Sequence, residues 1–517
     1  MALSVAFHSL GCKVNSYESE VMERSFIAHG FTVVPWQEKA DVYVVNTCSV
    51  TNIADRKSRQ MLHQARRKNP CALVVAVGCY VETDTDAVRA DTEIDLAVGN
   101  VDKARVVEHV EGWLVEKSGN DPAHIAPSTP LSPGQATFRT NADSRGLGLN
   151  SVAQKSQGSL PDFSLSMPAN THHEQPELTG SSSSRTRAFI KVQDGCNLFC
   201  SYCIIPYARG RNRSRDEEEI LAEVRAVAAA GVKEVVLTGI HISSYGKETD
   251  GGKYDRGTGT LSYFSSDGIG HSLPDEKYDS VPVPLSYFPL LNLLSRLHEI
   301  DGIERIRLSS LEPRIVTEEF AEGLAALPKV CPHFHLSLQS GDNATLMRMR
   351  RHYTVGEYKK SVERLRRVYD NPAITTDIIC GFPGETEEQF ARTLAFAEEI
   401  GFYEIHVFPY SKRKGTAAAS FAGQLTNAVK KERASRLLAL TAEQSRTYRA
   451  QFLNKKLRVL WEDTERSNGG IFMIGNTERY VRVAMNVSDL SEEEIDALSG
   501  TFSEVTPTAF LDDETLV

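Results

Sequence analysis

The chain has 517 residues, of which 41% are hydrophobic and 24% are charged, and its formal net charge is −10. This length predicts about three domains, and the composition is that of a globular protein with enough apolar residues for a sizeable core. A negative net charge excludes attraction of nucleic acid by the protein as a whole, so an RNA contact needs a local basic patch.

The sequence also predicts a soluble, cytoplasmic protein without a membrane partner. No apolar run approaches the ~18 residues that a membrane span needs. The start, MALSVAFHSLGCK, has no basic region, and His8 and Ser9 interrupt its apolar stretch, so it is not a signal peptide. The nine dispersed cysteines fit metal ligands or buried thiols in a reducing compartment better than a disulfide framework.

Residues 1–117 alternate between strand and helix patterns. Short apolar runs predict strands at residues 5–10, 42–46, 73–78 and 96–99. Amphipathic spacing predicts helices at residues 17–29, 52–68 and 103–117. This alternation predicts a small α/β, doubly wound domain.

Residues 118–186 are rich in Ser, Pro, Gly, Thr, Asn and Gln and have no period, which predicts a low-complexity linker. The alternation returns over residues 187–445, with strands predicted at residues 188–192, 234–237, 305–309, 333–338, 374–379 and 404–408. Helices are predicted at residues 217–230, 289–299, 355–369 and 387–400. Six repeats predict an open partial (βα)6 barrel, interrupted by a second low-complexity insertion at about residues 247–283.

The last predicted domain, residues 446–517, begins within a long polar helix predicted at about 430–454, and short strands follow that helix. These are predicted at residues 456–461, 470–474, 480–484 and 500–511. They predict a small all-β barrel of a kind that often contacts RNA.

Three cysteines lie close together in the run DGCNLFCSYCIIP. Cys196, Cys200 and Cys203 form a Cys-x3-Cys-x2-Cys triplet, which can bind three irons of a 4Fe–4S cluster and leave the fourth iron open. A structural zinc site is the alternative, but such sites usually have four ligands, and the sequence offers no Cys or His pair nearby. With Tyr202 before its last cysteine, the triplet resembles the radical S-adenosylmethionine (SAM) superfamily. That resemblance implies cleavage of SAM to a 5′-deoxyadenosyl radical.

A second set of cysteines shares a structural position. Cys12, Cys48 and Cys79 each follow a predicted strand, and the carboxyl ends of parallel strands meet at one edge of a sheet. Three converging thiols could hold a second 4Fe–4S cluster, although three unrelated buried cysteines remain the alternative. The other cysteines lack this position and are interpreted as small core or near-core residues: Cys71, Cys331 and Cys380.

The three-domain order resembles that of the radical SAM methylthiotransferases, whose C-terminal domain is a TRAM module. The sequence around the first cysteine is LGCKVNSYES, and the sequence around the triplet is GCNLFCSYCIIPYARG. Both resemble the sequences of the subgroup that modifies N6-threonylcarbamoyladenosine in tRNA beside the anticodon. The resemblance implies two 4Fe–4S clusters, SAM, an electron donor and a sulfur source. It implies that the second cluster holds the sulfur that becomes a methylthio group on C2 of the adenine.

The carboxyl edge of the barrel is the expected SAM site. The candidate contacts there are Thr238, Gly239, Glu312, Gln339, Ser340 and Asp377. Candidate RNA contacts are Arg209, Arg211, Arg213 and Arg215 after the triplet, together with Arg479 and Arg482 in the β domain. Trp461 and Tyr480 suit base stacking or core packing about equally.

Other functions compete with this interpretation. Isopentenyladenosine-type enzymes usually read Gly-Cys-Gln-Met-Asn at the first site, and enzymes acting on ribosomal protein S12 read Gly-Cys-Pro-Lys-Asn, whereas this chain reads Gly-Cys-Lys-Val-Asn. A non-catalytic iron–sulfur protein that binds RNA or senses redox state is a further alternative. The open corner of the triplet disfavours it.

Overall fold

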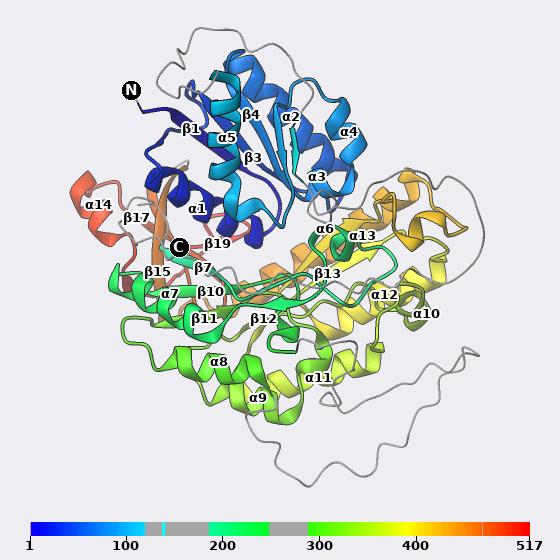
Figure 1. Ribbon diagram of the computed structural model, residues 1–517. Coiled ribbons are helices and arrows are strands. Elements are labelled where there is room, and N and C mark those ends of the chain that lie inside the picture. Colours follow the sequence, from blue (N-terminus) through cyan, green and yellow to red (C-terminus); the bar gives the residue numbers. More distant parts are fainter. Residues whose placement is uncertain (1, 119–136, 140–185, 248–287, 468) are drawn as a thin grey trace. The chain divides into compact units, whose positions relative to one another are not determined.

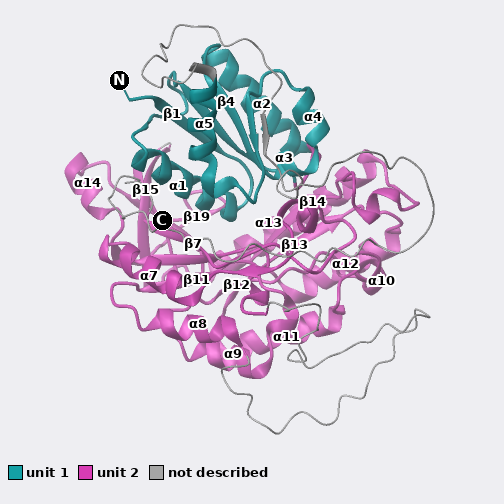
Figure 2. Cartoon of the chain, viewed as in Figure 1, with its two compact units in different colours: residues 1–49, 53–179 teal, residues 50–52, 180–517 magenta. Residues whose placement is uncertain are grey.

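A computed structural model describes residues 2–118, 137–139, 186–247, 288–467 and 469–517 (Figure 1). The chain divides into two compact units, residues 1–49 with 53–179 and residues 50–52 with 180–517 (Figure 2). Most of the predicted linker and almost all of the predicted insertion lie outside the described residues. Among the helices that are described, none combines the length and the apolar character needed to cross a membrane.

Unit 1 contains a parallel sheet in the order β2-β1-β3-β4-β5-β6. Its first five strands are β1 (Ser4–Ser9), β2 (Thr32–Val33), β3 (Val42–Thr47), β4 (Leu73–Gly78) and β5 (Leu96–Val98). Its helices are α1 (Lys13–Ala28), α2 (Asn52–Lys68), α3 (Cys79–Thr83), α4 (Thr85–Ala90) and α5 (Val106–Ser118), with a 3-10 turn, η1 (Lys103–Arg105), before α5.

Helices cover both faces of this sheet, because successive strand residues point to opposite faces. Val42 and Val44 of β3 pack in one core with Phe26 of α1. Tyr43 and Val45 pack in a second core with Leu62 of α2. The predicted doubly wound domain is confirmed.

A sixth strand, β6 (Thr137–Arg139), pairs in parallel with β5. It falls within residues 118–186, where the sequence predicted only linker. Three residues are too few for a strand pattern to be recognised within a polar sequence. Only the backbone pairing with β5 identifies these residues as a strand.

Unit 2 contains the six predicted barrel strands, in two sheets of order β11-β10-β7 and β12-β13-β14. The strands are β7 (Arg187–Lys191), β10 (Glu234–Thr238), β11 (Arg305–Leu308), β12 (His333–His335), β13 (Ala373–Cys380) and β14 (Glu404–Pro409). Neighbouring strands are parallel within each sheet, and the parallel bridge Leu311↔Leu336 joins the two sheets. The result is an open arrangement of six strands, as predicted.

Helices pack against the barrel strands through a large apolar core. The predicted helices are present as α7 (Glu217–Ala229), α8 (Pro289–His298), α11 (Val355–Val368), α12 (Glu387–Ile400) and α13 (Asn427–Ala450). The structure adds three shorter helices: α6 (Ile205–Arg209), α9 (Glu318–Ala325) and α10 (Asn343–Arg348).

The last part of unit 2 is a five-stranded sheet in the order β18-β15-β16-β17-β19. Its strands are β15 (Leu457–Ser467), β16 (Gly470–Asn476), β17 (Arg482–Asn486), β18 (Phe502–Val505) and β19 (Thr515–Leu516). The pairings are antiparallel except for β17 with β19. A short helix that the sequence did not predict, α14 (Glu492–Leu498), begins with a capping box at Ser491.

A buried ion pair links this sheet to the barrel. Glu234 on β10 accepts hydrogen bonds from the Arg307 guanidinium at 2.9 and 3.2 Å, and both side chains are almost fully buried. Arg307 also donates to the carbonyl oxygens of Thr477 and Glu478 and lies over the ring of Tyr480 at 3.6 Å. The loop before β17 is thereby held against the amino-terminal end of the barrel strands.

Candidate functional site

The cysteine triplet lies on a loop that starts from a crowded glycine. Gly195 has φ +70°, and a Cβ there would lie 1.9 Å from the Arg211 carbonyl oxygen, so only glycine fits. The Cys196 amide donates to the Gly210 carbonyl at 3.1 Å. Ser201 then ties the loop to the carboxyl end of α10, because its amide donates to the Met349 carbonyl and its hydroxyl donates to the Arg348 carbonyl. These bonds fix the loop that carries all three thiols.

The three thiols of this loop are close enough to affect one another electrostatically. Burial, and then the neighbouring cysteines, raise the pKa of Cys196 to about 11 and that of Cys203 to about 12. Cysteines bind iron as thiolates, so a cluster bound here must displace the protons of these thiols. Its binding must also compensate for the cost of burying negatively charged sulfur. A buried cation beside the thiols would assist this.

Arg351 is that cation. Its Nη1 donates to Cys200 Sγ at 3.2 Å, its Nη2 pairs with Glu312 at 2.6 Å, and its Nε donates to the Tyr353 hydroxyl at 3.2 Å. Burial opposes its charge, but Glu312 and the neighbouring Tyr353 and Cys200 outweigh burial, so the pKa of Arg351 lies well above its usual value. The sequence placed Arg351 only in a basic cluster with Arg348 and Arg350 and did not connect it with the cysteines, because its partners Glu312 and Cys200 are 39 and 151 residues away in the chain.

Several residues proposed for SAM lie at the carboxyl ends of the barrel strands. Thr238 is the last residue of β10. Gly239 follows it and packs against Gln193, because a Cβ added to Gly239 would lie 2.9 Å from the Gln193 main-chain oxygen. The Glu312 carboxylate is held by Arg351, and its amide donates to the Ser243 hydroxyl at 2.9 Å.

The other three candidates follow β12 or lie on β13. Gln339 has the unusual φ of +70° and forms a bridge with Ile378. Ser340 is fully buried, with its hydroxyl 3.3 Å from that of Thr393. Asp377 lies 3.2 Å from Nε2 of His335, a side chain that the sequence analysis did not identify.

The arginines after the triplet have internal roles in the structure. The Arg209 side chain is buried and pairs with Asp194 at 3.0 Å, and Arg213 lies 3.6 Å from the same carboxylate. Arg215 donates to the Lys191 carbonyl and to Glu223. Arg209 therefore holds the triplet loop in this structure, and its contact with an RNA phosphate stays a prediction. Arg211 is exposed and lies over the Phe199 ring at 4.5 Å.

The aromatic candidates of the β domain belong to its core. Trp461 is fully buried and donates to the Ser503 hydroxyl at 2.6 Å, and Tyr480 lies against Arg307. Arg479 donates to main-chain carbonyls of Asp370 and Asn371. Arg482 pairs with Glu465 at 2.5 Å. Of the two predicted alternatives, base stacking and core packing, the structure shows core packing for Trp461 and Tyr480.

In unit 1, the second set of cysteines lies where three strands end. Cys12 directly precedes α1 at its N-cap position, Cys48 follows β3, and Cys79 is the first residue of α3, directly after β4. Gly11 has φ +102°, and a Cβ there would lie 2.7 Å from Cys48 Sγ, so the first two cysteine loops are in close contact. Asn100, in the loop after β5, approaches Cys79 Sγ to 3.7 Å with its amide nitrogen. β1, β3 and β4 are neighbours in the sheet, so the three loops share one edge.

A buried polar network lies beneath these loops. Asn15 donates to the carbonyls of Leu10 at 2.7 Å and Thr47 at 3.0 Å, and so joins the first two loops. The Thr47 hydroxyl donates to the Val77 carbonyl and accepts from the Tyr80 amide, which adds the third loop.

Lys103, also buried, pairs with Glu18 at 2.8 Å and donates to Asn46 at 3.0 Å. Spacing showed no sign of this network, but polar residues at the ends of buried strands are a usable signal for such sites.

All nine cysteines lie within the described residues, and none forms a disulfide; Cys331 and Cys380 are buried and Cys71 is partly buried, as predicted. Within the described ranges, no three or more His, Cys, Asp or Glu side chains gather as ligands of one metal ion. A 4Fe–4S cluster binds each cysteine through a separate iron, so it does not need such a gathering. Each triplet offers three thiols on fixed loops, a donor set that fits a cluster with one open iron.

Comparison with known proteins gives two family matches. Residues 190–397 match the radical SAM superfamily, and residues 4–99 match the family described as Uncharacterized protein family UPF0004. Among solved structures, the radical SAM methyltransferase TsrM from Kitasatospora setae covers 79% of this chain and 75% of its own at 17% identity, with a TM-score of 0.46, which is too low to support a functional conclusion.

Curated relatives match over most of their length. The threonylcarbamoyladenosine tRNA methylthiotransferase MtaB of Bacillus subtilis is 34% identical over 93% of this chain and 90% of its own. The enzyme of the same name from Aquifex aeolicus is 34% identical over 89% and 92%. The tRNA-2-methylthio-N(6)-dimethylallyladenosine synthase of Caldicellulosiruptor saccharolyticus is 32% identical over 92% and 85%. At this identity and coverage, the chain belongs to the radical SAM tRNA methylthiotransferase family.

Proposed function

We propose that this chain transfers a methylthio group to C2 of N6-threonylcarbamoyladenosine beside the anticodon of tRNA, with SAM and two 4Fe–4S clusters. The observation that carries the proposal is the presence of two cysteine triplets, each on loops at the end of strands in its own α/β unit. Relatives that are named for this reaction match both units.

In this proposal Cys196, Cys200 and Cys203 hold the cluster that cleaves SAM. When bound, that cluster and SAM supply a radical able to remove hydrogen from an unactivated ring carbon. Arg351 stabilises the negative charge on Cys200, and Glu312 holds Arg351 in place. The strand-end residues Thr238, Gly239, Gln339, Ser340 and Asp377 remain our candidates for orienting SAM.

Cys12, Cys48 and Cys79 hold the second cluster in the same proposal. Gly11 keeps the first two loops in contact, and Asn15 joins them by donating to the Leu10 and Thr47 carbonyls. This part of the chain would present the sulfur that is transferred.

The same chemistry on isopentenyladenosine is the second candidate, because the Caldicellulosiruptor relative, named for dimethylallyladenosine, is 32% identical. The residues Gly11, Cys12, Lys13, Val14 and Asn15 favour the first candidate. In the structure Lys13 begins α1 directly after Cys12, so the residue types that distinguish the two subgroups lie beside the proposed second cluster.

The test is nucleoside mass spectrometry of tRNA from cells that lack endogenous tRNA methylthiotransferases and express this chain. We expect the methylthio derivative of threonylcarbamoyladenosine, with isopentenyladenosine unmodified. The Cys48→Ala variant is the matched inactive control. Appearance of methylthio-isopentenyladenosine alone would replace the first candidate with the second, and modification of ribosomal protein S12 without tRNA would refute both.

A further inference from the structure

The exposed side of α2 is unusually basic for a chain of net charge −10. Of its 17 residues, six are Lys or Arg and one, Asp55, is acidic. Asp55 is buried and accepts a hydrogen bond from the Ser49 hydroxyl at 2.8 Å, and this single carboxylate cannot balance six basic side chains. The helix therefore presents an excess of positive charge to solvent.

Some of these cations are used within unit 1 and others are not. Arg66 pairs with Asp95 at 2.5 Å and donates to three main-chain carbonyls. Lys68 donates to the Trp36 carbonyl. Arg56, Lys57 and Arg67 are exposed, and the described part of the chain provides no hydrogen-bond or ion-pair partner for them. We call these three residues the α2 ridge.

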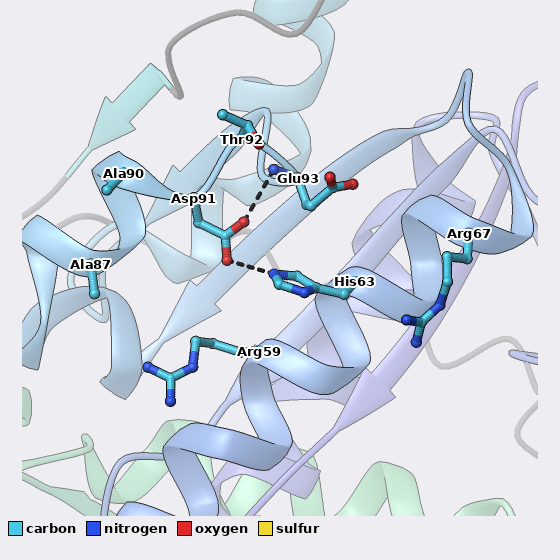
Figure 3. A pocket seen from close by; sticks show the side chains of 8 residues that line it. All are labelled: Arg59, His63, Arg67, Ala87, Ala90, Asp91, Thr92 and Glu93. Atoms are coloured by element: carbon cyan, nitrogen blue, oxygen red, sulfur yellow. Dashed lines mark hydrogen bonds and ion pairs between the residues drawn. The ribbon is translucent and has the colours of Figure 1, made fainter.

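A shallow hollow of about 680 Å³ lies beside the last residue of the ridge, Arg67, which lines it. Figure 3 shows Arg59, His63 and Arg67 along α2, with Asp91 and Glu93 on the segment across from them. Both acids are already engaged: Asp91 lies 2.8 Å from His63, and Glu93 lies 3.7 Å from Arg66. Among the described residues, neither acid therefore forms an ion pair with a cation of the ridge.

The helix also carries the residue that anchors the second cysteine of the proposed cluster. The Ser58 hydroxyl accepts from the Cys48 amide at 3.3 Å and donates to the Cys48 carbonyl at 3.1 Å, with both groups buried. Arg56 and Lys57 lie within one helical turn of Ser58 and point away from the core, so the ridge starts close to the cysteine loop. At 1.5 Å per residue, Arg56 and Arg67 are about 16 Å apart along the helix axis.

We infer that the α2 ridge binds the sugar–phosphate backbone of the substrate tRNA. This inference rests on the proposed function, in which a base of that tRNA receives sulfur at the cysteine edge of unit 1. A base held at that edge brings its flanking phosphates close to the start of α2, and the exposed guanidinium and ammonium groups of the α2 ridge match a repeating anion. The ridge contributes affinity without reading sequence.

The experiment measures affinity of the full-length, reconstituted protein for a tRNA anticodon stem-loop as a function of salt. Removing one cation–phosphate interaction should reduce the slope of log K against log salt by about 1, so Arg56→Glu/Arg67→Glu should reduce it by about 2. The matched control is Arg225→Glu/Lys360→Glu, which reverses two exposed cations on α7 and α11. We expect the control to keep the wild-type slope.

Three further measurements make the result decisive. Iron content and circular dichroism should be unchanged in both variants, and Arg56→Gln/Arg67→Gln should give a smaller loss of affinity in the same direction. A wild-type slope in the ridge variant, or an equal loss in the control, would overturn the inference and leave the proposed function standing. A wild-type protein that does not bind the stem-loop would refute the proposed function itself.

Discussion

The ion pair between barrel and β sheet allows a sharp test of how unit 2 is held together. In the wild type, the Glu234 carboxylate lies 2.9, 3.6 and 4.0 Å from the guanidinium groups of Arg307, Arg305 and Arg187. Replacing Glu234 with Gln removes this shared negative charge. Arg307 is fully buried, and removing one partner of a buried pair costs about 3–5 kcal/mol because the other charge is left uncompensated. We expect the free energy of unfolding of unit 2 to fall by about that amount.

The chain has three tryptophans, and Trp461 is buried in the β sheet that this ion pair holds. In a Trp36→Phe/Trp113→Phe background, fluorescence during urea unfolding reports on unit 2 alone. Adding Arg307→Met to Glu234→Gln should recover part of the loss, because the unpaired buried charge is then removed.

Glu304→Gln is the matched surface control, since Glu304 is about one-third exposed, and it should cost less than about 1 kcal/mol. A loss below about 1 kcal/mol in Glu234→Gln, or no recovery in the double variant, would refute the argument.

The pH dependence of the same variants gives an independent check. Burial opposes ionisation of Glu234, but the three arginines outweigh it and lower the pKa of this carboxyl in the folded protein. Its contribution to stability is therefore present above the pKa of the unfolded chain and is lost as pH falls through the lower, folded value. The Glu234→Gln variant should lose less stability than the wild type over that acidic range.

Three further predictions concern the proposed clusters. Replacing the radical SAM triplet with alanine should leave about four of the eight irons expected from two clusters after anaerobic reconstitution, and no SAM cleavage; zinc in the wild type would contradict this. Gly11→Ala should lower iron content by about half, because the added Cβ would lie 2.7 Å from Cys48 Sγ and the backbone there has a positive φ. Gly30 also has a positive φ, but a Cβ added there would have no atom within 4 Å, so Gly30→Ala is the control for backbone strain alone. Arg351→Gln should shift the reduction potential of the cluster downward in an EPR titration, because a cation donating to Cys200 favours the more negative, reduced state; an upward shift would contradict the role given to Arg351.

The sequence by itself predicted the elements that have strong local patterns. The strand β4 and the helices α2 and α12 begin and end at the predicted residues, because each has a clear period and a marked boundary such as Thr386 before α12. The Cys196–Cys200–Cys203 spacing indicated an iron–sulfur loop without tertiary information, since the three cysteines lie within eight residues. Short elements such as β6 and α14 have too few residues for a pattern, and only pairing or capping in the folded chain defines them.

Only the tertiary structure decided what most charged residues do. Arg209 and Arg211 are two residues apart in one basic run, yet Arg209 is buried against Asp194 and Arg211 is exposed. The two side chains differ because α6 ends at Arg209 and the chain turns at Gly210, where φ is +78°. Arg351 meets Cys200 across 151 residues, a distance that no local pattern encodes. Local periodicity determines the backbone element, whereas the partner of a long polar side chain depends on which distant segment the fold places beside it.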